Sequence, residues 1–220
     1  MDDSTITTSE ITKTLLKNSL TKLSDYRPIF HSEADFQHSL AWQIKVSHPD
    51  AEIRLETPMG RNEVGFVDLR VQIDNLKIAI ELKYLVKKIS YGQNDSESFF
   101  LKNQGAQDIR RYDVIKDLCR VESLVKSKDS DSGAVIILTN DEQYWKKRNK
   151  NRITIDSDFR IHQDEVLTGE RMWRGEPSAG TIKNRDKKLT VEGNYRLNWL
   201  DFSDLEEKNG TFRYLFICVE

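Results

Sequence analysis

The order of apolar patterns along the chain predicts an α/β fold. Two amphipathic helical patterns come first, two alternating strands follow them, and a long helical pattern comes next. The segment GAVIILT at 133–139 is almost entirely apolar and rich in β-branched residues, as expected of a strand covered on both faces. Helices that alternate with strands in this way favour a mixed sheet with helices packed against it.

Helical spacing predicts three long helices. Apolar residues recur through 7–24 at helical intervals, and the helix should end at Tyr26-Arg27-Pro28. Ser32 suits the N-cap of a second helix over 32–47. A third helix is expected from about residue 103 to residue 126.

Shorter segments of alternating apolar residues predict the strands. A short strand is expected at 52–57, and a hairpin at 64–84 with its turn at Asp74-Asn75. The stretch SYGQNDSES at 90–98 is typical of a polar loop. We therefore expect the central elements to be helix, three strands, helix and buried strand.

The chain after residue 140 has a weaker pattern. DEQYWKKR indicates a short helix, and residues 175–190 an exposed loop. FRIH, YRLNWLDF and TFRYLFICV indicate strands, with turns at Gly193-Asn194 and Asn209-Gly210. These strands could extend the main sheet or form a separate β appendage. We divide the chain into an N-terminal helix (1–28), a core (29–148) and a β-rich extension (149–220) packed on the core as one domain.

The composition restricts the class of protein. The 220 residues suffice for one well-buried domain, and the apolar runs AVIIL and LFICV are much shorter than the roughly 18 residues of a membrane span. The beginning, MDDSTITTSE, lacks the pattern of a secretory signal. Cys119 and Cys218 have no Cys or His at ligand spacing, which favours buried reduced thiols. We expect a cytoplasmic protein with no membrane partner.

The charge balance gives no overall attraction to nucleic acid. The net charge is −2, so any such contact would have to be local. Basic residues gather at 85–89 and 146–152, where a solvated surface is the ordinary interpretation.

The hairpin at 64–84 places charged residues on one face. With a two-residue turn at Asp74-Asn75, opposing residue numbers sum to 149, so that Asp68 lies opposite Glu81. Two opposed acids cost roughly 0.2–1 kcal/mol, and a divalent cation such as Mg²⁺ would compensate for that cost. Lys83 points to the same face as Glu81 and could neutralise charge on a phosphate.

The alternative is that these charges form the solvated face of an ordinary exposed hairpin. Two observations weigh against it. Ala79 and Phe66 interrupt the polar face, and the following helical segment offers polar groups on one stripe. That stripe comprises Gln104, Asp108, Arg111 and Tyr112.

These residues together resemble the PD-(D/E)xK phosphodiesterase superfamily, which includes many restriction and repair nucleases. Asp68 is followed after twelve residues by Glu81-Leu82-Lys83, and a helix bearing Glu33 precedes them. The similarity runs from Glu33 to about Asn140, roughly half of the chain, and its motif is short. Residue 67 is Val, where the name of the family has proline.

The resemblance implies an αβββαβ restriction-endonuclease-like core and Mg²⁺-dependent hydrolysis of phosphodiester bonds, with Mn²⁺ able to substitute. Asp68 and Glu81 would be the metal ligands and Lys83 the catalytic lysine, with Glu33 and Gln104 as further catalytic residues.

Contacts with nucleic acid, expected to be DNA, would come from basic and aromatic residues near these acids. The candidates are Lys87, Lys88, Arg111 and Tyr112. Two other functions stay open, a non-catalytic module of the same fold that binds nucleic acid or a protein, and a structural or interaction protein. The sequence also leaves homo-oligomerisation open.

Overall fold

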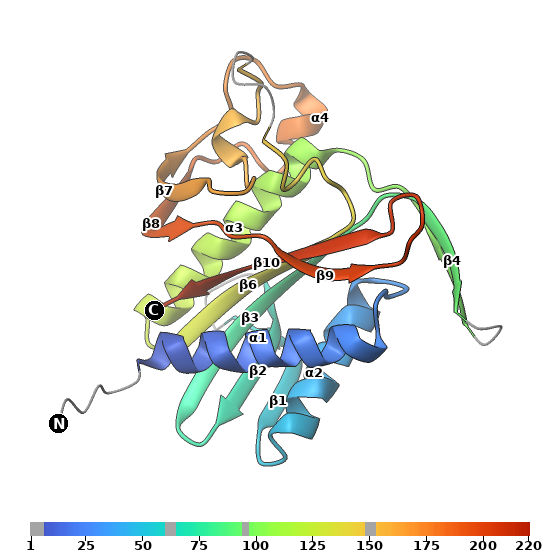
Figure 1. The fold of residues 1–220 in the computed structure, drawn as a ribbon. Helices are drawn as coiled ribbons and strands as arrows, with labels where there is room; N and C mark the ends of the chain where they lie inside the picture. The colour runs from blue at the N-terminus through green and yellow to red at the C-terminus, as the bar shows by residue number, and fades with distance from the viewer. Residues whose placement is uncertain (1–6, 60–64, 94–96, 148–152) are drawn as a thin grey trace.

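A six-stranded mixed sheet forms the centre of the protein (Figure 1). The computed structural model describes residues 7–59, 65–93, 97–147 and 153–220. The strand order is β1-β2-β3-β6-β10-β9, in which β3 and β6 are parallel and every other neighbouring pair is antiparallel. The strands are β1 (Glu52–Pro58), β2 (Phe66–Ile73), β3 (Leu76–Leu85), β6 (Ser132–Thr139), β9 (Leu200–Asp204) and β10 (Thr211–Val219). The predicted α/β class with a mixed sheet is confirmed.

Helices cover both faces of this sheet. On one face, α1 (Thr8–Tyr26) and α2 (Glu33–Ser47) pack in the same apolar core as alternate residues of β2, β3 and β6. On the other face lies α3 (Gln107–Lys126), whose apolar residues pack with Val135 and Ile137 of β6 and Leu215 of β10. Every residue of β6 is buried, as predicted for a strand covered on both faces.

The starts of the helices follow from local hydrogen bonds. The Thr7 side chain and Glu10 form a capping box at the start of α1, and Ser32 Oγ accepts the N–H of Asp35 at 3.1 Å. The third helix begins later than predicted, because Ala106 adopts a left-handed conformation (φ 59°) immediately before it. Gln104 therefore precedes the helix.

Some local predictions are wrong. The described residues of the predicted loop at 90–98 are in strands, because β4 (Ile89–Gln93) and β5 (Glu97–Leu101) pair as a hairpin. FRIH overlaps a short 3₁₀ helix, η1 (Ser157–Phe159), and DEQYWKKR, as far as it is described, consists mainly of turns. Gly193-Asn194 lies inside β8 (Leu189–Arg196), while the turn at Asn209-Gly210 is confirmed.

The C-terminal segment both extends the main sheet and forms a separate β appendage, the two alternatives that the sequence left open. Strands β9 and β10 extend the main sheet, whereas β7 (Val166–Arg171) pairs with β8 in a separate two-stranded sheet. The short helix α4 (Ala179–Ile182) interrupts the expected loop at 175–190. This segment packs on α3, since Leu167 and Val191 share an apolar core with Leu118.

Two further properties concern the whole chain. Among the described residues, no helix is long and apolar enough to cross a membrane. Cys119 and Cys218 are free thiols, as expected, although each is half-buried rather than buried.

Candidate active site

The β2–β3 ladder stops one pair short of the two predicted metal ligands. Its register is the predicted one, with Ile73 opposite Leu76 and Leu69 opposite Ile80. Beyond the last pair, the N–H of Leu82 donates to Asp68 Oδ2 at 2.6 Å. The Asp68 side chain therefore accepts this N–H in place of a backbone carbonyl of β2. Strand β3 continues to Leu85 beside β6. The two strands therefore part where Asp68 and Glu81 lie.

Glu33 holds the next part of β3. Its Oε2 accepts the N–H of Tyr84 at 2.7 Å, and Glu33 is the first residue of α2. The Tyr84 hydroxyl donates to Phe30 O at 3.0 Å and lies 3.2 Å from Phe30 N, which fixes the chain before α2 against the sheet. Carboxylates from β2 and α2 thus bind alternate N–H groups of β3.

Gln37 is a positioning residue that the sequence did not indicate. Its Nε2 donates to Asp68 O at 2.7 Å and to Glu56 Oε1 at 3.0 Å. Gln37 is buried on α2, one helical turn after Glu33. It therefore supports the backbone of Asp68, while the N–H of Leu82 binds the side chain of the same residue.

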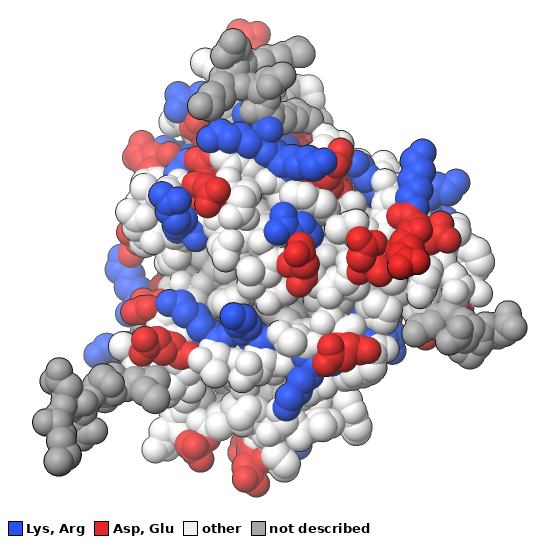
Figure 2. Space-filling view, in the orientation of Figure 1, with Lys and Arg blue, Asp and Glu red and all other residues white. Residues whose placement is uncertain are grey.

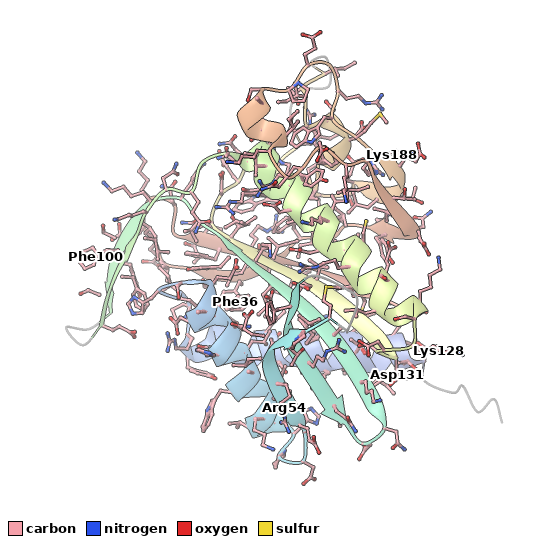
Figure 3. The ribbon with its side chains drawn as sticks, turned by 180° about the vertical axis from the view of Figure 1, so that it is seen from behind. Phe36, Arg54, Phe100, Lys128, Asp131 and Lys188 are labelled. Carbon is pink, nitrogen blue, oxygen red and sulfur yellow. The ribbon has the colours of Figure 1, made fainter. Side chains whose placement is uncertain are left out.

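All five predicted catalytic residues line one groove of about 480 Å³. Figure 3 views the molecule from this side, where α3 crosses the sheet and leaves the β1–β2 part in view. The groove has five acidic and five basic residues in its lining, so its charges balance. The acids are Glu33, Asp68, Glu81, Asp113 and Asp117, and the bases are Lys83, Arg110, Lys116, Arg120 and Arg185.

Helix α3 supplies the partners of Glu81 and Lys83. Lys83 Nζ lies 2.7 Å from Asp117 Oδ2 and donates to Leu82 O at 3.0 Å. Arg120 Nη2 lies 2.6 Å from Glu81 Oε1 and 3.1 Å from Asp117 Oδ1. Asp117 and Arg120 were not predicted, because they lie on a stripe of α3 next to the predicted one.

Glu81 is the most unusual carboxylate of the groove. Its side chain is 0% exposed, and neither oxygen accepts a hydrogen bond from any residue that the structure describes. The approach of Arg120 is close but lacks hydrogen-bond geometry, so we treat it as a contact of charges. Burial, followed by the charges of Asp117 and Asp68, raises the pKa of Glu81 to about 8.

The pKa values of three ionisable groups near Glu81 are also raised. Burial raises the pKa of Asp68 and of Glu33, against the lowering effects of Lys83 and of their backbone hydrogen bonds. Burial would lower the pKa of Lys83, but the carboxylates of Asp117 and Glu33 outweigh it and raise that pKa. Lys83 is therefore a fixed positive charge among carboxyl groups that resist ionisation.

The predicted nucleic-acid contacts are only partly on the surface, and two of them need correction. Arg111 is buried, with Nη1 2.5 Å from Asp156 Oδ2. Tyr112 is also buried, stacked on Trp173 with ring centroids 5.6 Å apart. Both are covered by the C-terminal segment and cannot reach a substrate without unfolding it.

The two lysines of the predicted contact set differ from each other. Lys87 Nζ lies 3.0 Å from Asp141 Oδ1, and its side chain is 24% exposed. Lys88 is exposed. Lys88 is therefore the member of the set most accessible to a substrate.

Comparison with known proteins adds no further constraint. No protein-family model, curated protein or solved structure matches this chain. Within the part of the chain that the structure describes, no group of three or more His, Cys, Asp or Glu side chains is arranged to hold a metal ion. What the protein does must therefore be inferred from the groove and its residues.

Proposed function

We propose that the protein is a metal-dependent nuclease that hydrolyses phosphodiester bonds, with DNA as the expected substrate. The observation that supports this most strongly is the convergence of Asp68, Glu81 and Lys83 in one open groove. Apart from the β4–β5 hairpin, which is inserted between β3 and α3, the chain order α2, β1, β2, β3, α3, β6 is also that of an αβββαβ core, the arrangement implied by the PD-(D/E)xK resemblance.

The two acids suit a divalent cation. Glu81 Oε1 lies 2.6 Å from Arg120 Nη2, and Glu81 Oε2 is buried without a partner among the described residues, although buried polar atoms normally have one. Asp68 and Glu81 would hold Mg²⁺ or Mn²⁺, and two carboxylates suffice because Mg²⁺ keeps several waters and binds substrate phosphates. When bound, such a cation polarises a phosphate and makes a neighbouring water more acidic.

The remaining groups of the groove would act on the substrate. The ammonium of Lys83, held by Asp117, would stabilise the negative charge that develops on the phosphate in the transition state. Arg110 and Lys116 line the same groove and could contact flanking phosphates. Glu33, Gln37 and the N–H of Leu82 would keep the acids in position.

A non-catalytic module is the rival, and one observation favours it. The contacts of Arg120 with Glu81 and of Lys83 with Asp117 make the groove neutral within itself, as in a structural ion-pair network. Against it, a site made only for phosphate binding gains nothing from five acidic residues that offset the charge of its five basic residues.

Cleavage of a mixed substrate panel separates the two functions. The panel is linear duplex DNA, single-stranded DNA, branched DNA and RNA, each with Mg²⁺ or Mn²⁺. We expect wild type to cut at least one member and Lys83→Ala to cut it about 100-fold more slowly, the usual effect of removing one transition-state charge. Lys77→Ala is the control, since Lys77 lies on the same strand and face but outside the groove.

Two results would count against the proposal. Wild type that binds the panel but cuts none of it with either metal would support the non-catalytic module. If wild type cuts and Lys83→Ala cuts as fast, the assignment of Lys83 is wrong.

A further inference from the structure

The β4–β5 hairpin projects from the body of the protein (Figure 1). One of its faces is anchored in the core, where Ile89, Phe99 and Leu101 are buried. Phe99 also stacks on His31 with ring centroids 4.3 Å apart, and His31 Nε2 lies 2.9 Å from Glu97 Oε1. The hairpin is therefore a supported element whose other face is turned outward.

That outward face has an unusual composition. Phe100 is 74% exposed, and Figure 3 labels it on the hairpin. It pairs across the hairpin with Ser90, while Gly92 pairs with Ser98, so that small residues leave the ring uncovered. Alternation places Ser90, Gly92, Ser98 and Phe100 on this face, and the exposed Lys88 and Lys102 lie immediately outside the two strands. We call these six exposed residues, all neutral or basic, the hairpin platform.

The hairpin platform begins at the rim of the groove. Leu85 and Gln104, which flank the hairpin in the chain, both line the groove. The N–H of Gln104 donates to Val86 O at 2.9 Å and closes the base of the hairpin. Lys102 is two residues from Gln104, at most about 7 Å along the chain.

We propose that the hairpin platform binds a single-stranded segment of the nucleic acid that enters the groove. Phe100 stacks on one base, and Lys88 and Lys102 contact phosphates. This inference rests on the proposed nuclease function, and it adds a substrate preference to it. An aromatic ring between lysines matches a single strand, in which each nucleotide offers a phosphate and an accessible base face.

A duplex fits this surface less well. Its base faces are stacked internally, and two lysines give few of the phosphate contacts on which duplex affinity depends. On the face of the molecule shown in Figure 2, basic and acidic side chains of the described residues are interspersed, so charge does not draw a duplex there either. Among the six described residues of the hairpin platform, in contrast, two are lysines and none is acidic.

Binding of a short single strand that carries a fluorescent adenine analogue tests the inference. The full-length protein is used in EDTA, and a blunt duplex of the same sequence is measured beside it. We expect Phe100→Ala to weaken single-strand binding about tenfold, or about 1.4 kcal/mol, and to remove the quenching of the analogue. Phe100→Trp should restore both.

The salt dependence of binding tests the two lysines of the hairpin platform. Replacing Lys88 and Lys102 by Ala should flatten the slope of log affinity against log salt by about 1.4, because each phosphate contact on a single strand contributes about 0.7.

The matched control for Phe100→Ala is Trp42→Ala, which removes an aromatic side chain that is 69% exposed on α2 outside the groove. It should leave single-strand binding unchanged.

The outcomes separate this inference from the proposed function. If Phe100→Ala binds single strands as tightly as wild type with quenching intact, the proposal that the hairpin platform binds a single strand is wrong, whether or not wild type cuts DNA. If Phe100→Ala weakens binding but wild type cuts no substrate, that proposal is supported and the proposed nuclease function is wrong. Equal losses on single strand and duplex would overturn the substrate preference.

Discussion

Glu81→Gln should stabilise the metal-free protein at neutral and alkaline pH. The folded state raises the pKa of this carboxyl from 4.5 to about 8, mainly through burial. Because the folded state favours the protonated acid, the stabilisation that Glu81 contributes is complete below pH 4.5 and is lost as the pH rises through about 8. Glutamine keeps the shape of the protonated acid and cannot ionise.

The size of the effect follows from the same values. Each pH unit above 4.5, up to about 8, removes about 1.4 kcal/mol from the free energy of unfolding. At pH 7 this gives about 3 kcal/mol, and adjustment of Arg120 and water in the open groove should reduce it to about 2 kcal/mol. For a chain of this size, about 2 kcal/mol corresponds to roughly 6 °C in the melting temperature.

Thermal unfolding in EDTA at pH 5, 7 and 8.5 measures the effect. The advantage of Glu81→Gln over wild type should be small at pH 5 and largest at pH 8.5. Glu176→Gln, at an exposed position, is the control and should melt like wild type at every pH. With Mg²⁺ present, wild type and Glu176→Gln should gain stability, whereas Glu81→Gln should not. A Glu81→Gln variant that is less stable than wild type at pH 8.5 in EDTA would refute the reasoning.

Three further predictions concern the same groove and its supports. Affinity for Mn²⁺, measured by calorimetric titration, should rise up to tenfold per pH unit as the pH approaches 8, and a flat profile would contradict ionisation of Glu81 as the controlling step. Arg111→Ala should lower the free energy of unfolding by about 3 kcal/mol because it leaves Asp156 buried without its cation, and an unchanged urea midpoint would show otherwise. Glu33→Gln should slow cleavage less than Asp68→Asn does, since the proposed role of Glu33 is to hold β3 through the N–H of Tyr84, whereas Asp68 would also bind the metal, and equal losses in a rate comparison would place Glu33 among the metal ligands.

The local part of the site could be predicted from the sequence. The turn at Asp74-Asn75 and the matched apolar pairs determine the register of β2 and β3, and that register places Asp68 and Glu81 directly beyond the last pair of the ladder, Leu69 and Ile80. Ser32 marks the start of α2 and so the position of Glu33. These are short-range signals in one hairpin and one helix cap.

The partners from α3 could not be predicted, because they depend on tertiary packing. The helix is covered by the sheet on one side and by the C-terminal segment on another, which buries Arg111 and Tyr112. The stripe left facing the groove carries Asp117 and Arg120. Which stripe remains depends on a segment that is far away in the sequence.

The β4–β5 hairpin was missed for a different reason. Polar and small residues dominate 90–98, and the apolar residues that bury its inner face, Ile89 and Leu101, lie just outside that stretch. Alternation is visible only when the two arms are read together across the polar centre. A local pattern that depends on burial of one face is therefore easily mistaken for a loop.

Diffraction from crystals soaked in Mn²⁺ tests the central claim most directly, because the anomalous signal locates the ion without any assumption about the substrate. The proposal predicts a peak in the groove in contact with carboxylate oxygens of both Asp68 and Glu81, with Arg120 displaced from Glu81. Soaked crystals at saturating Mn²⁺ that show no peak there, with Arg120 still beside Glu81, would contradict it.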